Sequence, residues 1–509
     1  MKKSTLLLVS IGSGILTGGL LALAFPSGAW LRSWLAYGAV CVPACAALAL
    51  AWRGSGAGRG LAWMLLLAFG LRVATGALLQ AALPLHGNGS KPELNGYLFY
   101  DAYARDQAAW TLAQSDQPLS AAFGGQYADD DQYGGLLALS ALAYRLLSPD
   151  AVRPLLTVLL GAFVYALGLP FLVAAIRLRW GAFASSVAGW IYVLYPQSVL
   201  LGAAQMREPF LMGALALATW AVVRLPERKW TAAGVLAASL AGAALVSWRI
   251  ALAGGGVLLV WLALDQLKRV EPRVQRWSWV ALLLAAGALI AFASREWLSA
   301  SGAWDIKLLQ EGSGMVDKRL GELPEALRLP FILAYGVAQP VLPAAVADVT
   351  IPLRQVISIL WAVGWYALAP LLLFALFAVW RARPTAERLV LVWLALAALL
   401  WTLLSALRGG GDQWDNPRYR TIFLPWMGLL AGWAWQWARE RGNPWLGRVY
   451  ALAAVFIGGF MLWYLGRYAG WFGGLPFWNV VVGVVLISAA IVAAGWWRDR
   501  SLTRRREKL

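Results

Sequence analysis

The chain contains few of the residues that carry most soluble-enzyme chemistry. Among 509 residues it has one histidine, two cysteines and only 13% charged residues. A single histidine, His86, excludes a multi-histidine metal site and a Ser-His-Asp hydrolase. The cysteines, Cys41 and Cys45, lie inside one apolar run and are typical of packing. The phosphate-binding loop and the GxGxxG dinucleotide fingerprint are absent, so nucleotide-driven transport is not expected.

Apolar residues take the place of the missing charge. They make up 61% of the chain, and the mean hydropathy is +0.64; soluble domains are nearer half apolar and a quarter charged. Apolar runs of about 17 to 25 residues recur, and each can cross a hydrocarbon core of about 30 Å as a helix. We therefore predict an all-α polytopic membrane protein. The first run, 4–25, lacks a convincing cleavage site and is interpreted as an uncleaved span.

The net charge of +18 is interpreted as a topology signal. Basic residues gather in alternate short loops and in the tail 498–509, whereas acidic residues gather in the longer loops between them. This distribution follows the positive-inside rule. It predicts a cytoplasmic (inner or plasma) membrane location with both termini cytoplasmic and no nucleic-acid partner. The predicted outer loops are 86–133, 196–207, 296–354 and 408–420.

About fourteen transmembrane helices are predicted from the apolar runs. The segment 134–148 is interpreted as an interfacial or re-entrant helix on the outer side, because a crossing there would place the basic loop at 177–181 outside. We divide the chain into an N-terminal two-helix extension (1–60), a catalytic region (61–440) and C-terminal helices with a basic cytoplasmic tail (441–509). The predicted spans are 4–25, 34–52, 61–85, 152–176, 181–195, 208–224, 230–248, 251–266, 277–295, 356–379, 388–407, 421–437, 449–467 and 476–496.

The first outer loop carries two candidate catalytic acids, Asp101 and Asp106, in the stretch LFYDAYARDQAAW. A carboxylate at the membrane surface can act as a general base on a lipid-linked substrate, and Tyr103 could line the acceptor path. The alternative is ordinary loop polarity, with Asp101 as a helix cap and Asp106 paired with Arg105.

A second group of candidates lies where later spans begin. Arg207 and Glu208 interrupt an apolar stretch before Pro209, and charges at such positions are often functional. In WDNPRYRTIFLP, two arginines at headgroup level can bind phosphate in a bidentate manner. Snorkelling to general lipid phosphates is the alternative. The candidates for substrate or phosphate contact in these stretches are Arg207, Arg249, Arg418, Tyr419 and Arg420.

Three consecutive aspartates, Asp129, Asp130 and Asp131, raise the question of a metal site. Carboxylate oxygens are the ligands that hard divalent cations prefer. Adjacent residues seldom all face one ion, however, and such a run is usually a solvated surface. The sequence therefore predicts no cofactor with certainty, and a divalent cation stays an open alternative.

The order of these stretches resembles the GT-C class of membrane glycosyltransferases, close to the family 39 branch of protein mannosyltransferases and aminoarabinose transferases. The resemblance runs over about residues 61–440, from YDAYARD through LYPQSVLLGAAQMREPFLM to NPRYRTIFLPW. The Asp-Glu pair of the mannosyltransferases is Asp101-Ala102 here. Gln132 and Tyr133 stand where that family has a His-Pro-Pro-type stretch, and both are candidates for substrate contact.

The resemblance implies a polyprenyl-phosphate-linked sugar as donor and transfer at the outer face of the membrane, and the mechanism we favour is a single inverting displacement. Carried over by position, Asp101 is the base, Glu208 the second acid, and Arg418 and Arg420 lie near the donor phosphate. The implied partners are the donor, a lipid, glycan or protein acceptor, and membrane lipids. Two alternatives stay open: a polysaccharide polymerase or ligase that uses lipid-linked glycans, and a secondary transporter or lipid flippase.

Overall fold

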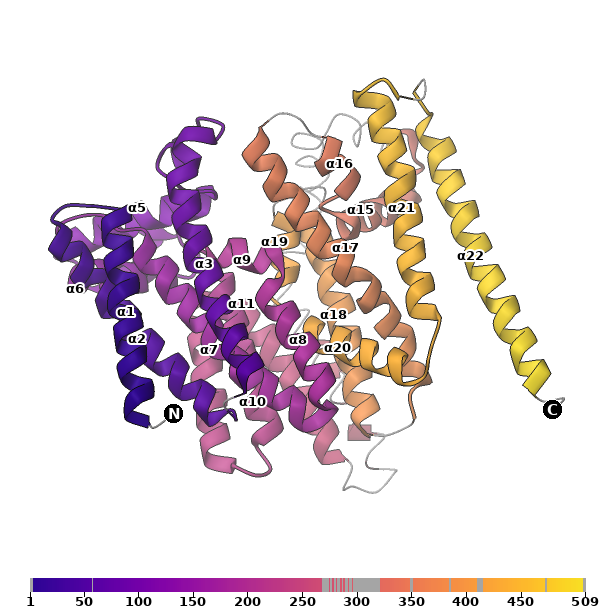
Figure 1. Ribbon diagram of the computed structural model, residues 1–509, viewed down its shortest axis with the longest axis horizontal. Coiled ribbons are helices and arrows are strands. Elements are labelled where there is room, and N and C mark those ends of the chain that lie inside the picture. The colour runs from indigo at the N-terminus through magenta and orange to yellow at the C-terminus, as the bar shows by residue number, and fades with distance from the viewer. Residues whose placement is uncertain are drawn as a thin grey trace. The chain divides into compact units, whose positions relative to one another are not determined.

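A computed structural model gives the fold. It describes residues 3–56, 58–267, 321–347, 351–383, 386–409, 415–471 and 474–506, with scattered residues between 274 and 295. Their regular structure is helical, as predicted (Figure 1). Nine helices in this described part are long and apolar enough to cross a membrane, which indicates a multi-pass α-helical membrane protein.

The long helices are α1 (Lys3–Ala24), α2 (Trp30–Gly54), α3 (Arg59–His86), α7 (Leu155–Trp180), α10 (Glu208–Arg224), α11 (Lys229–Leu267), α17 (Pro352–Arg381), α18 (Ala386–Gly409), α20 (Leu424–Glu440), α21 (Trp445–Tyr468) and α22 (Phe477–Arg506). The shorter ones are α4 (Lys91–Leu94), α5 (Tyr100–Gln114), η1 (Leu119–Phe123), η2 (Gly125–Tyr127), α6 (Gly135–Leu147), α8 (Ala182–Leu194), α9 (Pro196–Gly202), α15 (Glu325–Ala338), α16 (Leu342–Ala347) and α19 (Asp415–Thr421).

Every predicted span except 277–295 coincides with one of these helices or with half of one. Most of 277–295 lies outside the described residues, as do 296–320 and 348–350 of the predicted outer loop 296–354. Helix α8 has 13 residues, about 20 Å at 1.5 Å per residue, and is too short to count as a span by length. The number fourteen therefore remains a prediction.

Two predicted loops are partly helical. The segment 196–207 was expected to be a turn, but it contains α9, which begins at Pro196, a residue whose fixed φ favours the first helical position. The loop expected at 408–420 likewise contains α19. The segment 134–148 forms the 13-residue helix α6, and its interfacial or re-entrant placement stays a prediction.

Helix α11 is a hairpin of two antiparallel halves. The backbone leaves the helical conformation at Ser247 (φ −162°, ψ 99°). Beyond it the chain reverses, because Leu240 lies within 4 Å of a Cβ placed on Gly255. Both ends of α11 also meet the same end of α7, through Ala232 in one half and Asp265 in the other. The predicted pair of spans 230–248 and 251–266 is confirmed as two helical halves.

The chain forms two compact units. The first comprises Met1–Gly302 and Arg418–Gly428, and the second comprises Ala303–Pro417 and Leu429–Leu509. The predicted extension, residues 1–60, belongs to the first unit, where α1 and α2 pack closely. A Cβ on Gly14 would lie 2.6 Å from the Val42 Cα, so this helix crossing requires glycine. The functional division into regions 1–60, 61–440 and 441–509 stays a prediction.

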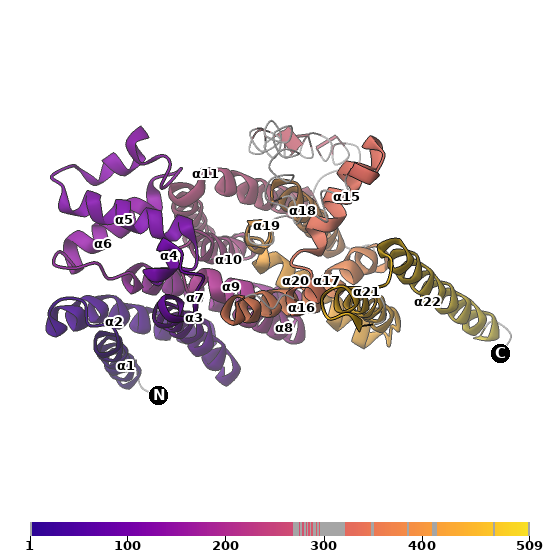
Figure 2. The ribbon, with the colours of Figure 1, turned by 90° about the horizontal axis from the view of Figure 1, so that it is seen from above.

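The first unit has two chemically different ends. Helices α7 and α10 run in the same direction, because Gly161 lies beside Phe210 near their starts and Ala175 clusters with Trp220 near their ends. Their final turns carry basic residues, and Arg179 pairs with Asp265 there at 2.6 Å. The opposite end holds α6, the start of α10 and the turn of α11. Figure 2 shows α5 and α6 side by side within this unit.

In the second unit, α17, α18 and α21 each contain a long apolar stretch and pack with α15, α16 and α22. Helix α22 contacts α21 and is joined to it by Arg448, whose guanidinium donates to both oxygens of Asp499 at 2.7 and 2.8 Å. Most of its apolar surface is exposed, including Val485 and Leu486. Such a surface suits a hydrocarbon environment, in which exposed apolar side chains carry no penalty.

Candidate functional site

Asp101 lies in the first turn of α5, where a carboxylate is stabilised by the helix dipole. The preceding aromatic run, Tyr97 to Phe99, is buried and fixes the start of this helix. The neighbouring Ala102 is buried as well, whereas the Asp101 side chain is 49% exposed. Helix α5 thus presents the Asp101 carboxylate at an accessible position.

Arg418 connects Asp101 to Glu208. Its Nη1 donates to Asp101 Oδ2 at 2.8 Å, and its Nε donates to Glu208 Oε1 at 2.5 Å. Glu208 is the first residue of α10 and is buried, as is Arg418 in α19. Three stretches about a hundred or more residues apart, each predicted to be functional, therefore meet at one guanidinium.

The surroundings keep Asp101 ionised. Partial burial raises its pKa, but the Arg418 guanidinium, with Arg105 and Arg207 nearby, lowers it further, so the pKa lies below its usual value. In this state Asp101 is a carboxylate over the whole neutral range. It is also a weak base for as long as Arg418 holds it.

A second ion-pair network lies beside the first. Arg105 is four residues after Asp101 and therefore lies on the same side of α5. It is fully buried, donates to the Gln205 carbonyl at 2.8 Å, and lies 3.8 Å from Asp131 Oδ1. The same oxygen of Asp131 accepts from Arg207 at 2.6 Å. Burial and the nearby Arg207 lower the pKa of Arg105 to about 10, so it remains a cation at neutral pH.

The metal interpretation of the aspartate run finds no support in the contacts. Asp131 uses Oδ1 for arginine and Oδ2 to accept the Leu137 amide at 2.9 Å, near the start of α6. Asp129 is exposed and Asp130 half-buried on a turn. Within the described residues, no group of three His, Cys, Asp or Glu could hold a metal ion. Asp131 is better described as the residue that positions two arginines.

Tyr133 joins the network to the turn of α11. Its ring lies 4.8 Å from the Arg207 Cζ and 5.9 Å from the Arg249 Cζ, and Arg249 follows the break at Ser247 by two residues. A Cβ on Gly135 would lie 1.9 Å from the Leu245 carbonyl oxygen. Glycine at 135 therefore allows the start of α6 to approach the hairpin and sets Tyr133 against Arg249.

Asp106 occupies a different environment from Asp101. It is completely buried and accepts hydrogen bonds from the hydroxyls of Tyr144, at 2.6 Å, and Tyr97. Burial raises its pKa, although these hydrogen bonds lower it in part. The expected alternative pairing with Arg105 is not its main contact. Asp106 fixes α5 to α6 and to the preceding loop, which makes it a positioning residue.

The other residues predicted to contact substrate lie in three different surroundings. Arg420 is buried, and its side chain hydrogen-bonds the Tyr195 hydroxyl, while the Tyr419 ring lies 5.7 Å from the Arg418 Cζ. Tyr103 instead packs edge-to-face on Tyr97 with centroids 5.4 Å apart. Gln132 is exposed, next to Tyr133. The structure thus brings Tyr419 and Tyr133 to the arginines and directs Tyr103 to the aromatic run.

Several buried polar atoms around this site have no hydrogen-bond partner within the described part of the chain. They are Glu208 Oε2, Arg105 Nε, Arg207 Nε and Gln205 Oε1. An unpaired buried polar atom costs about 1–3 kcal/mol, and such atoms in native proteins usually meet water or a ligand. These four atoms near Arg418 are therefore available to a polar molecule that binds there.

The sequence did not indicate that Arg105 belongs to the ion-pair network of Asp131. It also did not indicate that Tyr97 and Tyr144 are the partners of Asp106. The helical spacing of four from Asp101 to Arg105 was a usable signal for the first. Nothing local indicates the two tyrosines, because Tyr144 lies 38 residues from its carboxylate partner.

No protein-family model matches the chain, and a search of curated proteins gives no significant match. The class of protein must therefore be argued from the helices and from the chemistry of the site.

Proposed function

We propose that the chain is a membrane glycosyltransferase of the GT-C class that moves a sugar from a polyprenyl-phosphate donor to an acceptor. The reaction takes place at the outer face of the cytoplasmic membrane, in a chain of about fourteen spans with both termini cytoplasmic. The observation that carries the proposal is the meeting of Asp101 and Glu208 at Arg418, beside Arg105 and Arg207.

The charge content of this site suits a phosphodiester. Arg105, Arg207 and Arg418, with Arg249 next to Tyr133, supply four positive charges against Asp101, Asp131 and Glu208. A polyprenyl-phosphate sugar carries one negative charge on its phosphodiester oxygens. Guanidinium groups bind such oxygens in charge-assisted hydrogen bonds. The basic ends of α7 and α10, at the other end of the unit, support an outer location for the site.

The transfer is a single displacement. The acceptor oxygen or nitrogen forms a bond to the anomeric carbon, while the bond from that carbon to the phosphate oxygen breaks and the phosphate leaves with the electron pair. Asp101 takes the acceptor proton, and the configuration at carbon inverts. The arginines stabilise the negative charge that develops on the leaving phosphate, which is electrostatic catalysis.

Donor binding also prepares the base in this scheme. The donor phosphate competes with Asp101 for Arg418, and Glu208 keeps the guanidinium in place. Once Asp101 loses that partner, its pKa rises and it becomes a stronger base. The base is thus activated when the donor is bound, which favours a sequence in which the donor binds before the acceptor.

The donor site can be tested without knowing the sugar. Undecaprenyl phosphate, the type of product that leaves the site, is titrated against the purified chain in detergent, with undecaprenol as the uncharged control. A ligand that binds the folded state raises its melting temperature. We expect a shift with the phosphate and a smaller one with the alcohol. Equal shifts with both lipids would contradict a phosphate site at the arginines.

A glycosyltransferase and a flippase can be distinguished by whether the phosphodiester of the lipid-linked sugar is cleaved. In proteoliposomes made with a total lipid-linked sugar extract, a transferase converts phosphodiester into polyprenyl monophosphate in the presence of acceptor. A flippase moves the lipid and leaves the diester intact. Movement without monophosphate release would overturn the proposal in favour of a transporter.

A further inference from the structure

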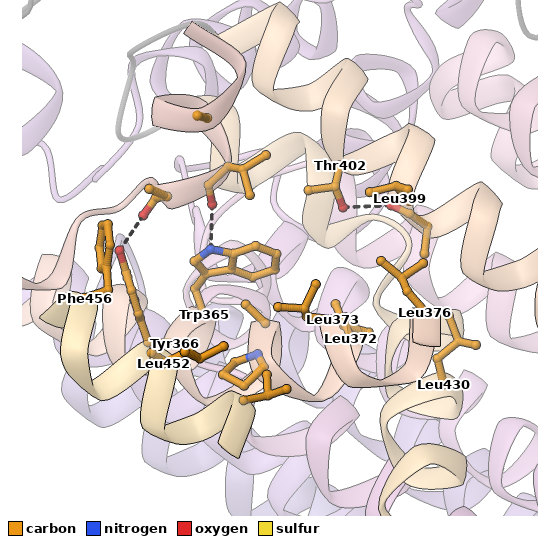
Figure 3. Close-up of a pocket in the computed structure, with 18 of the residues that line it drawn as sticks. Trp365, Tyr366, Leu372, Leu373, Leu376, Leu399, Thr402, Leu430, Leu452 and Phe456 are labelled. Carbon is orange, nitrogen blue, oxygen red and sulfur yellow. Dashed lines mark hydrogen bonds between the residues drawn. The ribbon is translucent and has the colours of Figure 1, made fainter. Parts of the chain in front are cut away.

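The second unit contains a partly open apolar cavity of about 400 Å³ between α15, α17, α18, α20 and α21. Figure 3 shows Leu373, Leu376 and Leu399 on its wall, together with the ring of Phe456. Its lining residues include none with a charge. The size is within the range of cavities that hold small ligands, about 300–1,000 Å³.

The polar groups on the wall are already used within the protein (Figure 3). Trp365 Nε1 donates to the Val337 carbonyl at 2.7 Å, and the Tyr366 hydroxyl donates to the Ala338 carbonyl at 3.1 Å. The Thr402 hydroxyl donates to a carbonyl of its own helix, that of Ala398, at 2.8 Å. A polar ligand would therefore lose its hydration here without gaining equivalent hydrogen bonds, which is unfavourable.

Water is a poor occupant for the same reason. An ordered water needs two to four polar partners, which this wall does not offer, whereas apolar molecules can fill such a space. Three of the five helices around the cavity, α17, α18 and α21, are long and apolar enough to cross a membrane. The medium around them is then hydrocarbon, so hydrocarbon chains are the molecules available to enter.

The volume indicates what kind of chain fits. A water molecule takes about 30 Å³, and a methylene group is of similar size, so about 400 Å³ holds roughly a dozen carbons. This is the length of much of one unbranched acyl chain. A polyprenyl chain is longer, and a methyl branch at every fourth carbon makes it wider.

We propose that the cavity between α15, α17, α18, α20 and α21 binds one acyl chain of a membrane phospholipid as a resident lipid. The bound chain replaces contacts that an empty cavity would lack, and lost contacts of this kind cost stability. The lipid therefore holds these five helices together. This role is independent of the charged site in the first unit.

The experiment measures phospholipid that stays with the full chain through detergent purification and gel filtration, by mass spectrometry of the extracted lipids. We expect about one phospholipid per wild-type chain. Ala398→Phe and Ala453→Phe place a ring in the cavity and should each reduce this amount at least threefold. Ala490→Phe makes the same change on the exposed surface of α22 and should retain the wild-type amount.

Filling the cavity should also make stability less dependent on lipid. Delipidation by a harsher detergent should lower the melting temperature of the wild type and of Ala490→Phe more than that of a filled variant that folds. Equal retention in wild type and in both filled variants would overturn the proposal. Retention of a polyprenyl lipid in place of phospholipid would overturn the choice of occupant, and no retained lipid in wild type would refute the site.

Discussion

The charged site of the first unit and the apolar cavity of the second use their polar groups differently. In the site, Glu208 Oε2 and Arg105 Nε are buried without a hydrogen-bond partner in the described chain. In the cavity, Trp365, Tyr366 and Thr402 each donate to a nearby carbonyl. Unused polar groups favour a polar molecule that completes them, whereas satisfied groups and an apolar wall favour hydrocarbon. The hydrogen bonding of their polar groups thus separates the charged site from the wall of the apolar cavity.

The largest effect that separates the charged site from the apolar cavity is expected from an isosteric change of Asp101. Asp101→Asn preserves volume but removes the carboxylate that we propose as the general base. General-base catalysis contributes about 10²- to 10⁴-fold, so turnover of a reconstituted lipid-linked sugar should fall by about that factor. Because the Asp101 side chain is half-exposed and Arg418 keeps Glu208, the melting temperature should change little.

Asp106→Asn is the matched control on the same helix. The amide can still accept from one tyrosine, so turnover should fall less than tenfold. The loss of a buried charge-assisted hydrogen bond should lower stability by about 1–3 kcal/mol. If Asp106→Asn abolished turnover and Asp101→Asn did not, the roles of the two carboxylates would have to be exchanged.

A smaller effect is expected for Arg418→Gln, measured on donor use. A charge-assisted contact to the donor phosphate contributes about 1.5–3 kcal/mol, which corresponds to a KM for donor about 10- to 150-fold higher. The KM for acceptor should change less. Arg228→Gln, on the exposed loop after α10, removes a charge elsewhere and serves as control. An unchanged donor KM in Arg418→Gln would leave Arg418 with a structural role between two carboxylates.

The sequence predicts much of this site because charge is rare in it. In a chain with 13% charged residues, Asp101, Glu208 and Arg418 stand out at the edges of apolar runs, and the cost of placing charge there makes such positions informative. The two spans on either side of Arg249 were likewise visible as separate apolar runs, and they form the two halves of α11.

The ion pairs between residues far apart in the chain could not be predicted from the sequence. Arg207 lies 76 residues from Asp131 and Arg418 lies 317 residues from Asp101, so no local spacing links them. From the sequence the aspartate run could be either a metal site or, more usually, a solvated surface, whereas in the structure Asp131 is buried between two arginines. The apolar cavity was also invisible, because its leucines and alanines look like those of any packed membrane helix.

The pH dependence of the proposed reaction compares wild type with Arg418→Gln. Asp101 must be ionised to act as base, and its pKa in the free protein is below the usual value of about 3.9. Activity measured as kcat/KM should therefore stay constant on acidification until the pH falls through that low pKa. In Arg418→Gln the pKa returns upward, so activity should be lost at a higher pH than in wild type.

The same experiment tests whether the donor displaces Asp101 from Arg418. The profile of kcat reports groups in the substrate complex, and that of kcat/KM reports the free protein. Displacement predicts that the acidic limb of kcat lies at higher pH than the limb of kcat/KM. Coincident limbs in wild type would mean that Asp101 keeps its arginine when donor is bound.

The smallest effect is expected from the isosteric change in the cavity, Thr402→Val. The Thr402 hydroxyl donates to the Ala398 carbonyl one turn earlier in its own helix, a bond that adds little and can slightly destabilise a helix. If the cavity holds only hydrocarbon, the added methyl is compatible with its occupant. Thermal unfolding should then change by less than about 1 kcal/mol, and phospholipid retention should equal that of wild type. A marked loss of bound lipid with unchanged folding would instead show that the hydroxyl contacts a polar ligand. The cavity would then be a recognition site, like the charged site in this respect, and the contrast between the two would fail.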